Sequence, residues 1–394
     1  MYKETRTKYR KQSRPRIGQK NHKQKSKIDI HKLINDQLET QPLKPYVQLH
    51  SFRDFSLHSK LLQRISDSKY LIPTEIQDKS ISHILNGSDL IGIAGTGTGK
   101  TAAFLIPIIQ QLIERPVKNK ALVIAPTREL ASQILEEFRK LSRGLDLHAT
   151  ALIGGVDVSR SIKALHKTNH VIIATPGRLI DMVERRHLSL ESFQILVLDE
   201  FDRMLDMGFL PDVQKIIDQM YNKQQTLLFS ATMNITQKAV IEWITNSPVK
   251  VTASTGRQLT HAIAQDVLYV PGDRTKAEVL HDLISENRNE KVLLFCDTKR
   301  MVNKVQKKLQ SGNIRSDMIH GDKTQRAREL ALERFRKGKV QVLVATDVVA
   351  RGIDVLDVSL VINYEVPGNY NDYVHRIGRT GRAGKSGKAI TLIG

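Results

Sequence analysis

Short apolar runs alternate with longer amphipathic stretches along most of this chain. From residue 90 to residue 229, apolar runs of four or five residues are separated by stretches with helical periodicity, such as Ala102–Glu114 and Glu129–Leu141. A second series of apolar runs follows after residue 262. This alternation is typical of parallel sheets whose strands are joined by crossover helices. The predicted strands are Leu90–Ala94, Ala121–Ala125, Ala149–Ile153, Val171–Ala174, Ile195–Leu198, Thr226–Phe229, Gln265–Tyr269, Val292–Cys296, Arg315–Ile319, Val340–Ala345, Leu360–Asn363 and Lys388–Ile393.

A short polar stretch from Ala253 to Gln258 separates the two series of strands. The chain has 394 residues, and at about 150 residues per domain this length corresponds to two or three domains. We therefore predict an α/β protein with two parallel-sheet domains, at residues 51–251 and 263–394. A linker at 252–262 joins them, and residues 1–50 form an extension before the first domain.

The charge of the chain is strongly positive and unevenly distributed. The formal net charge is +20 and the isoelectric point is about 9.9, which favours a polyanionic partner. Residues 1–27 contain eleven lysines and arginines but one acid, Glu4, and have very few apolar residues. Such a segment cannot bury enough apolar surface to offset its ordering entropy, so we expect a disordered basic tail.

Two motifs in the first half of the chain predict a site for a nucleoside triphosphate. Residues 94–101 read Ala-Gly-Thr-Gly-Thr-Gly-Lys-Thr. A glycine-rich loop can turn its N–H groups toward phosphates, while Lys100 reaches the β- and γ-phosphates and the Thr101 hydroxyl ligates Mg²⁺. Asp199 and Glu200 directly follow an apolar strand, where they can hold the metal and orient an attacking water. Alone, each motif is often only a loop or a helix cap; together, in this order, they favour an NTPase.

The polar residues with candidate chemistry repeatedly follow the ends of predicted strands. The loops concerned come after the first, second, fourth, fifth and sixth strands of the first series. In an open parallel sheet, ligands bind outside the carboxyl ends of the strands. We therefore expect these loops to share one edge of the first sheet. They are Gly95–Thr101, Pro126–Arg128, Thr175–Arg178, Asp199–Glu200 and Ser230–Thr232.

With these motifs in place, the chain from Phe52 to Gly394 resembles the DEAD-box RNA helicases, with the family's motifs in the family's order. The resemblance implies two RecA-like domains that share one site for ATP and Mg²⁺ and one surface for RNA. It also implies that ATP hydrolysis is coupled to local opening of an RNA duplex or to remodelling of an RNA–protein complex. The second half has no phosphate loop of its own, which fits a single nucleotide site between the domains.

The resemblance also implies the residues of the nucleotide site. Gln77 is expected to read the adenine edge, with Tyr70 against the adenine face; without the resemblance, Gln77 reads as a surface glutamine. The residues given to nucleotide binding are Phe52, Tyr70, Gln77, Ala94, Gly95, Thr96, Gly97, Thr98, Gly99, Lys100, Thr101, Asp199, Gly352 and Asp354. Those given to catalysis are Lys100, Glu200, Arg379 and Arg382, and those given to the metal are Thr101 and Asp199.

RNA is expected to cross both domains through contacts to its sugars and phosphates. Thr127 and Thr175 also have a simpler interpretation, because each precedes a predicted helix and could cap it. The residues that the resemblance gives to RNA are Pro126, Thr127, Arg128, Gly154, Gly155, Thr175, Pro176, Gly177, Arg178, Gly321, Gln325, Arg328 and Thr346. Those it gives to coupling between the two ligands are Asp202, Ser230, Thr232 and His375, with Asp202 bonded to the loop Ser230–Thr232.

The chain departs from the family pattern at several positions. Gly95 replaces the usual Gln of the phosphate loop, and Lys69–Tyr70 replaces the usual Gly-Phe. Phe201 stands where the name-giving motif has Ala. Two interpretations of Phe201 stay open: it packs in the core, which we favour, or it tunes the contact between Asp202 and the Ser-Ala-Thr loop.

Composition narrows the remaining classes of function. No apolar run approaches the roughly 20 residues of a membrane span, and the one cysteine, Cys296, fits a reducing compartment. We expect a monomeric, cytoplasmic, bacterial-type protein. The family continues through another helix beyond the position of Gly394, so we expect the chain to be shortened or unusually compact. A non-catalytic RNA chaperone that acts through its tail, and a DNA helicase, are the alternatives; the ATPase motifs argue against the first.

Overall fold

The computed structural model describes residues 46–95, 97–115, 120–233, 235–253, 263–287, 290–347, 358–381 and 387–394. The predicted basic tail and nearly all of the predicted linker lie outside these ranges. All structural statements below refer to the described residues. None of their helices combines the length and the apolar character that a membrane span requires.

The first half of the chain forms a seven-stranded parallel sheet, with strand order β3-β4-β2-β5-β6-β1-β7. Six of its strands coincide closely with predicted ones. The seventh was missed because β7, at the sheet edge, alternates two exposed polar residues with a half-buried and a buried valine, rather than forming an apolar run. The strands are β1 (Leu90–Ile93), β2 (Ala121–Ile124), β3 (Ala149–Leu152), β4 (Val171–Ala174), β5 (Ile195–Leu198), β6 (Gln225–Ser230) and β7 (Val249–Thr252).

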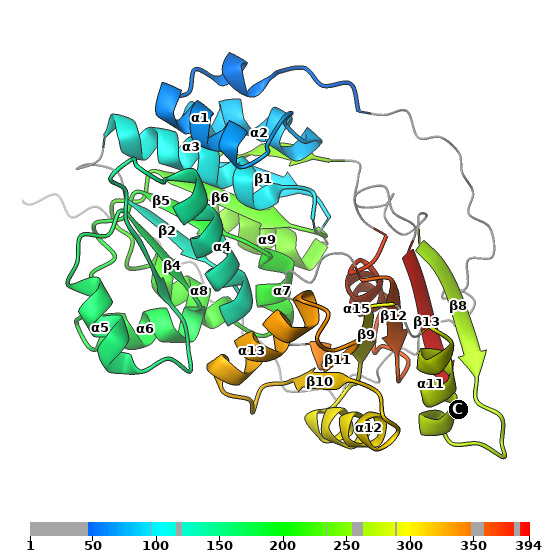
Figure 1. Cartoon of the computed structure of the whole chain (residues 1–394). Helices are drawn as coiled ribbons and strands as arrows, with labels where there is room; N and C mark the ends of the chain where they lie inside the picture. The colour runs from blue at the N-terminus through cyan, green and yellow to red at the C-terminus, as the bar shows by residue number, and fades with distance from the viewer. Residues whose placement is uncertain are drawn as a thin grey trace, which may run out of the picture.

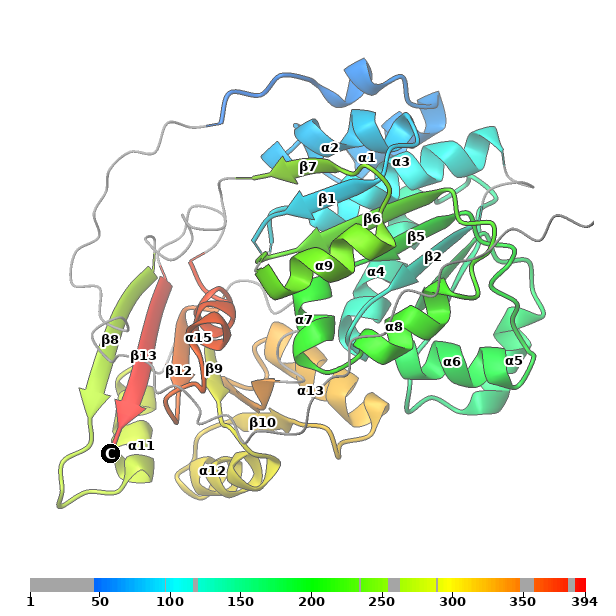
Figure 2. The ribbon, with the colours of Figure 1, turned by 180° about the vertical axis from the view of Figure 1, so that it is seen from behind.

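The second half forms a separate six-stranded parallel sheet, with strand order β10-β11-β9-β12-β13-β8. All six strands were predicted. The two sheets stand side by side (Figures 1 and 2), so the predicted parallel α/β architecture is confirmed. The strands are β8 (Ile263–Tyr269), β9 (Val292–Phe295), β10 (Ser316–Ile319), β11 (Val342–Ala345), β12 (Leu360–Asn363) and β13 (Gly387–Ile393).

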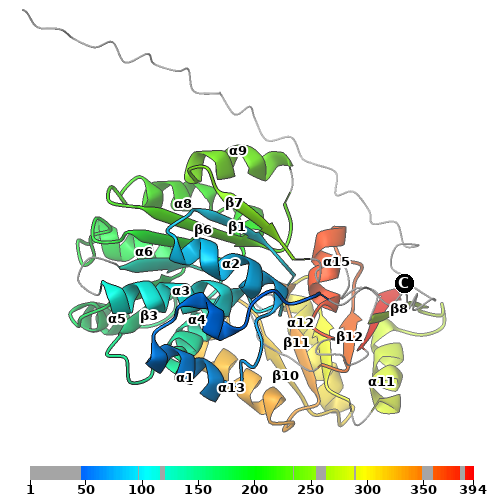
Figure 3. The ribbon, with the colours of Figure 1, turned by 90° about the horizontal axis from the view of Figure 1, so that it is seen from above.

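Helices cover both faces of the sheets. In the first domain they are η2 (Phe52–Phe55, a 3₁₀ helix), α1 (Ser59–Asp67), α2 (Glu75–Leu85), α3 (Lys100–Glu114), α4 (Arg128–Leu141), α5 (Val158–Leu165), α6 (Pro176–Glu184), α7 (Phe201–Asp206), α8 (Leu210–Ile217) and α9 (Ile235–Ile244). In the second they are α11 (Lys276–Glu286), α12 (Lys299–Ser311), α13 (Gln325–Arg336) and α15 (Tyr370–Ile377). Seen from above, α13 lies close to α4 of the first domain (Figure 3).

Each sheet separates two apolar cores because successive strand residues point to opposite faces. In β2, Val123 belongs to the core that includes α3 and α4, whereas Leu122 belongs to the core that includes α6 and α8. β9 behaves in the same way, with Phe295 and Leu294 in different cores. Strands buried on both faces read as continuous apolar runs, which is why the sequence pattern located them.

Phe201 lies entirely in the second of these cores. The side chain is at 0% exposure and belongs to the same apolar cluster as Leu198, Met204 and Leu228. A phenylalanine at the start of α7 therefore fills the space between this short helix and the sheet. The burial favours the packing interpretation of this departure from the family pattern.

We expect Phe201→Ala to lower the free energy of unfolding by about 3–5 kcal/mol, because it removes a buried ring and leaves a cavity. Phe201→Leu is the matched control and should cost less than about 1.5 kcal/mol, since it keeps most of the volume. Denaturant titration of the three proteins measures the difference. A Phe201→Ala protein as stable as the wild type, but with altered duplex opening per ATP, would instead support the coupling interpretation.

Candidate nucleotide and RNA sites

The phosphate loop joins β1 to the start of α3. Lys100 is the first residue of α3, and its Nζ donates to the carbonyl oxygen of Ala94 at 2.9 Å. Gly97 and Gly99 both adopt left-handed backbone angles, with φ of 78° and 92°, which side chains rarely tolerate. A side chain at Gly99 would also collide with Gln77. The loop is thus closed on itself, with its lysine buried at the position that the predicted cradle requires.

Gln77 is part of this cradle rather than of the surface. Its side chain is fully buried; Nε2 donates to the carbonyl oxygen of Gly99 at 3.1 Å, and Oε1 accepts from the N–H of Thr74 at 3.0 Å. The surface-glutamine interpretation is therefore wrong. The carboxamide ties the start of α2 to the phosphate loop, and each of these two bonds uses one of the two positions that its NH2 group and its oxygen offer.

Tyr70 and Phe52 lie together beside α4. Their rings meet edge-on, with centroids 6.4 Å apart. The Tyr70 hydroxyl donates to Oε1 of Glu137 at 2.8 Å, and burial is the main cause that raises the pKa of this phenol. The Nζ of Lys140 lies 5.3 Å from the ring centroid. Tyr replaces the family's Phe here and uses its hydroxyl to anchor the ring to α4.

The two acids after β5 have distinct environments. Asp199 is 2% exposed, and burial, opposed by Lys100, raises its pKa to about 7. Glu200 has a left-handed φ of 52°, a conformation that costs a residue with a side chain about 1–2 kcal/mol. Its Oε2 accepts from Nη1 of Arg203 at 3.0 Å. The strained backbone turns the chain sharply from β5 into α7, and the two carboxylates accept from different donors, Asp199 from the N–H of Glu200 and Glu200 from Arg203.

Asp202 bonds the loop after β6, as the sequence predicted. Its Oδ2 accepts from the N–H of Ala231 at 3.1 Å, and from the N–H and hydroxyl of Thr232, each at 2.9 Å. The Ser230 hydroxyl donates to the carbonyl oxygen of Thr232 at 2.6 Å. The acids that follow β5 and the Ser-Ala-Thr loop are thus joined by three hydrogen bonds to one oxygen.

Residues expected to contact RNA from both domains line one hollow of about 540 Å³. The first domain contributes the loops after β2, β3 and β4, and the second contributes residues at and before α13. Two lining residues form an ion pair between the domains: Arg328 Nη2 lies 2.5 Å from Glu129 Oε1, which ties α13 to α4. The predicted residues in the lining are Pro126, Thr127, Arg128, Gly154, Thr175, Gly177, Arg178, Gly321 and Arg328. Glu129, Asp181, Met207 and Phe209 complete it.

The two arginines of the first-domain loops are held by their surroundings. The guanidinium of Arg128 lies against Gly154 and Gly155, and a side chain at Gly155 would overlap it. The guanidinium of Arg178 donates to the Ser161 hydroxyl at 3.0 Å and to the Val156 carbonyl at 2.9 Å. The glycine pair therefore serves a close approach, which brings three separate loops together.

The helix-capping interpretation holds for one of the two threonines. The Thr127 hydroxyl accepts from the N–H of Leu130 at 3.4 Å, at the start of α4. Thr175 precedes α6, but its side chain makes no capping bond; Pro176 opens that helix. The Thr175 hydroxyl is thus not used to cap the helix that follows it, and Thr175 lines the hollow with Gly177.

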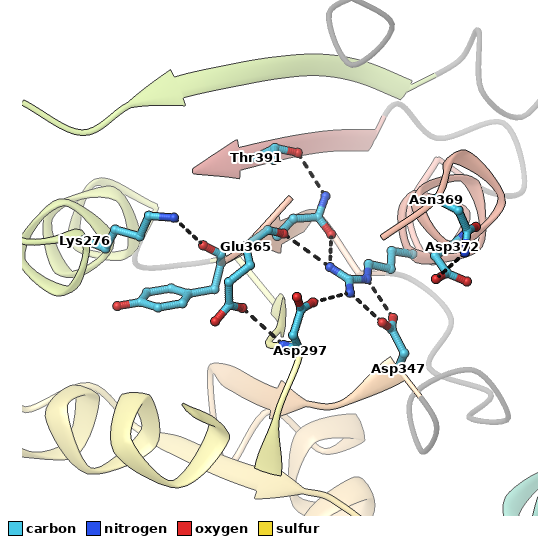
Figure 4. A network of polar contacts seen from close by, with 10 residues as sticks. Lys276, Asp297, Asp347, Glu365, Asn369, Asp372 and Thr391 are labelled. Carbon is cyan, nitrogen blue, oxygen red and sulfur yellow. Dashed lines mark hydrogen bonds and ion pairs between the residues drawn. The ribbon is translucent and has the colours of Figure 1, made fainter. Parts of the chain in front are cut away.

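In the second domain, Arg376 is buried at the centre of a polar network that the sequence did not predict. Its guanidinium donates to both Asp347 oxygens at 2.6 and 2.5 Å, to Asp297 Oδ1 at 3.0 Å and to Asn363 Oδ1 at 3.2 Å (Figure 4). The ring of Phe295 lies 5.3 Å below it. This network joins α15 to residues at the ends of β9, β11 and β12, and so fixes the start of the segment that carries Arg379.

The other predicted residues of the second domain are largely buried. Arg379 is 5% exposed and its Nε donates to the carbonyl oxygen of His375 at 3.3 Å. Gln325 opens α13 and donates to Glu329, while the Thr346 N–H donates to the Ile319 carbonyl. Four predicted residues lie outside the described ranges: Thr96, Gly352, Asp354 and Arg382.

Comparisons with known proteins agree with this geometry. The family model described as DEAD/DEAH box helicase matches residues 74–241, and the one described as helicase conserved C-terminal domain matches residues 275–384. The chain belongs to the DEAD-box helicase family.

It is 42% identical to the ATP-dependent RNA helicase CshA of Listeria monocytogenes, over 87% of the chain and 66% of the relative. It is 39% identical to the ATP-dependent rRNA helicase RRP3 of Yarrowia lipolytica, over 88% and 72%. The chain thus spans about two thirds of the length of these helicases.

Two solved helicase structures share the arrangement of both domains. Saccharomyces cerevisiae Dbp5 bound to RNA and ADP BeF3 superposes with a TM-score of 0.78 at 30% identity, covering 88% of this chain and 90% of that one. Mss116p bound to ssRNA and AMP-PNP superposes with a TM-score of 0.77 at 32% identity, covering 87% and 73%. The described part of this chain therefore resembles structures that hold both RNA and a nucleotide analogue.

The nucleotide site suits Mg²⁺ that is shared with phosphates. The described residues contain no cluster of three or more His, Cys, Asp or Glu side chains that could enclose a metal by themselves. Mg²⁺ commonly uses one or two carboxylates together with phosphate oxygens. Asp199 offers a carboxylate that is 2% exposed and whose pKa is raised mainly by that burial, and Thr101 offers a hydroxyl. These donors fit the metal.

We expect the affinity for ATP with Mg²⁺ to rise as the pH increases toward 7 and then to level off. The metal needs the Asp199 carboxylate, and the pKa of that group is raised to about 7 in the nucleotide-free protein. Because the pKa of Asp199 is higher in the folded protein than in the unfolded chain, the folded state binds the proton more tightly. Asp199 therefore lowers the free energy of unfolding of the nucleotide-free protein as the pH rises from the unfolded pKa toward 7. Fluorescence titrations between pH 6 and 8 measure the affinity. Asp199→Asn is the control and should show only the titration of ATP itself; an identical pH dependence in both proteins would contradict this assignment.

Proposed function

We propose that this protein is an ATP-dependent RNA helicase that couples the binding and hydrolysis of ATP to local opening of RNA duplexes or remodelling of RNA–protein complexes. The observation that carries the proposal is the hollow whose lining combines loops of the first domain with Gly321 and Arg328 of the second. RNA bound there touches both domains at once, so it favours their association. Residues 51–251 and 263–394 are the two domains in this proposal, and 252–262 is the linker.

The chain supplies the groups that ATP hydrolysis needs. The phosphate loop from Ala94 to Thr101 holds the phosphates, and Lys100 exchanges its bond to the Ala94 carbonyl for a phosphate oxygen. Thr101 and Asp199 hold Mg²⁺, which neutralises charge on the phosphates when bound. Glu200 orients the attacking water and accepts its proton.

The second domain completes the nucleotide site in this proposal. Arg379 and Arg382 stabilise the charge that develops on the transferred phosphoryl group, as arginine fingers do. Arg379 follows Arg376, whose network fixes the end of α15. Rigid support of this kind matters because an arginine finger is effective only when its guanidinium is held in the correct position relative to the phosphates. Hydrolysis is therefore fast only while the second domain lies against the first.

RNA recognition in this proposal depends on the sugar–phosphate backbone. The hollow is lined by Arg128 and Arg178, by three glycines and by Thr175, which can offer guanidinium groups, backbone N–H groups and a hydroxyl. Such groups position a backbone but carry little information about base sequence. The bonds that Thr232 donates to Asp202 join the loop after β6 to the helix that follows the nucleotide acids, and we assign coupling to them. Target choice then comes from other segments, such as the basic tail, or from partner proteins.

The proposed setting is the cytoplasm, and the proposed active form is the monomer. The one cysteine of the chain, Cys296, is buried in the second domain and has no second cysteine to pair with. This fits a reducing compartment. A non-catalytic RNA chaperone is the competing function, and ATP turnover with and without single-stranded RNA separates the two.

We expect Glu200→Gln and Lys100→Ala both to abolish ATP hydrolysis, by different routes. Glu200→Gln keeps the phosphate loop and the metal ligands but loses the group that orients water, so ATP still binds. Lys100→Ala removes charge from the phosphate cradle, so ATP binding weakens as well. Loss of one such group commonly costs about 10²–10³ in rate. Turnover and ATP affinity are measured separately; near-normal turnover by Glu200→Gln would overturn the assignment.

We expect Arg379→Ala to keep ATP binding and to lose RNA-stimulated turnover, since an arginine finger acts on charge in the transition state. The measurement is kcat at saturating RNA, with RNA affinity determined in parallel. Arg178→Ala is a useful contrast, because it removes a proposed RNA contact and should raise the RNA concentration required. If Arg379→Ala changed only RNA affinity, Arg379 would belong to the RNA surface.

A further inference from the structure

A second, larger hollow lies along β3, the end strand of the first sheet. Its volume is about 700 Å³, against about 540 Å³ for the hollow that we assign to RNA. The lining comes from β3 and the residue before it, from the end of α4 on one face of the sheet, and from α5 on the other face. We call this feature the β3-edge hollow.

Four cationic side chains line the β3-edge hollow, and among the described residues no carboxylate does. Arg139 lies near the end of α4, Arg160 and Lys163 lie on α5, and Lys167 lies in the bend that follows α5. All four are exposed. The fold thus gathers positive charge from separate elements around one hollow.

None of these four cations forms an ion pair with a carboxylate in the described part of the chain. Exposed cations elsewhere in the first domain do have such partners; Nε of Arg185, for example, lies 2.5 Å from Oδ1 of Asp181. Unpaired like charges repel one another across a shared hollow, and a bound polyanion removes that repulsion. The charge pattern therefore favours an anionic ligand.

Charge beside an edge strand also has a simpler explanation, because it can discourage the strand from pairing with another molecule. That protection commonly uses charged side chains on the edge strand itself, yet β3 reads Ala-Thr-Ala-Leu. The two explanations make different predictions. Loss of the charges causes aggregation if they protect the edge, and loss of ligand binding if they form a site.

The β3-edge hollow is joined to the hollow that we assign to RNA. Thr150 lines the first and Gly154 lines the second, and these residues are separated by at most about 14 Å of extended chain. Arg178, which also lines the RNA hollow, donates from Nη1 to the Ser161 hydroxyl on α5 at 3.0 Å. RNA that extends beyond the RNA hollow at this side is therefore within reach of the four cations.

We propose that the β3-edge hollow binds the phosphates of RNA that extends beyond the RNA hollow, and that it anchors this RNA independently of the second domain. Its lining belongs to the first domain alone, and α5 lies at the side away from the second domain (Figures 1 and 2). The contact therefore persists when the domains separate, and it keeps the RNA on the enzyme for another cycle of ATP hydrolysis. This inference rests on the proposed function of the protein as an RNA helicase.

The first test compares single-stranded RNAs of two lengths. Grooves for single strands hold roughly 4–16 nucleotides, so an RNA of about 6 nucleotides fills the RNA hollow alone and one of about 24 reaches both hollows. For the longer RNA, the triple variant Arg160→Gln/Lys163→Gln/Lys167→Gln should lower the slope of log affinity against log salt by about 2, since each phosphate contact contributes about 0.7. Raising the salt from about 50 to about 200 mM then weakens wild-type binding about 16-fold more than binding by the variant. The shorter RNA should show no such difference.

The matched control removes one arginine and two lysines from α12 of the second domain, in the variant Arg300→Gln/Lys304→Gln/Lys307→Gln. These side chains are exposed, and within the described part of the chain they form no ion pair. The control should lower the slope by less than one phosphate contact, about 0.7. Equal losses in the two triple variants would mean that net charge alone is responsible, and the proposal would fail. If thermal unfolding shows that the first triple variant is misfolded, Arg139→Gln/Lys167→Gln carries the same comparison.

The second test measures protection of lysines in the wild-type protein. Acetylation followed by mass spectrometry reports how accessible Lys163 and Lys167 are, with Lys304 and Lys307 as controls. The longer RNA should slow acetylation of the first pair severalfold, equally with ADP and with a non-hydrolysable ATP analogue, and the shorter RNA should not. Protection that requires the ATP analogue would overturn the independent anchor. Protection by polyglutamate but not by RNA would identify an acidic protein segment as the occupant, and would also overturn the proposal.

These experiments separate the inference from the proposed function. The shorter RNA fills the RNA hollow alone, so ATP turnover at its saturating concentration tests the proposed function without the β3-edge hollow. Wild-type protein that RNA does not stimulate would refute the proposed function, and this inference with it. Stimulated turnover, together with equal binding of the longer RNA by the wild type and the triple variant, would refute the inference alone. Aggregation of that variant with unchanged RNA binding would show that the charges protect the sheet edge instead.

Discussion

Parallel strand pairing is the constraint on which the rest of this molecule depends. All the strand pairs of both sheets are parallel, so the loops that follow neighbouring strands emerge at the same edge. Loops that are far apart in sequence, from Gly95 to Thr232, thereby lie at one edge of the sheet, and the parallel strand order alone is enough to bring them there. The same constraint in the second sheet places Thr346 and the start of α13 at its own loop edge.

Several charged side chains are buried between these loops, and their pairing decides the electrostatics of the site. Asp199 is almost completely buried, which raises its pKa, Glu200 is paired with Arg203, and Glu129 receives a partner from the other domain. Ion pairs of this kind contribute little net stability, because desolvation offsets most of the attraction. These ion pairs do make the electrostatic free energy of the buried carboxylates depend on which cationic side chains lie beside them. Arg376 shows the opposite case, since its partners Asp297, Asp347 and Asn363 belong to its own domain and do not depend on contact with the first.

Much of the fold could be predicted because parallel strands that are buried on both faces appear in the sequence as continuous apolar runs. Twelve strands appear in the sequence as apolar runs. The sequence pattern did not predict β7, because its edge position exposes half of its residues. The candidate site could be predicted where a motif is local, as in the phosphate loop and the pair Asp199–Glu200. The network around Arg376 and the contact between Arg203 and Glu200 could not, because an isolated charged residue reads as solvent-exposed unless its neighbours are known.

The sequence by itself determined the family, the class of fold, the order of the loops and the chemistry that each loop can offer, because these depend on local pattern and on residue type. Only the tertiary structure decided which groups face one another. It showed that Gln77 braces the phosphate loop, that Phe201 fills a core, and that Glu129 meets Arg328. The physical reason is that pairing and burial are set by distance in space, and residues 129 and 328 are neighbours only after two separate sheets have folded and met.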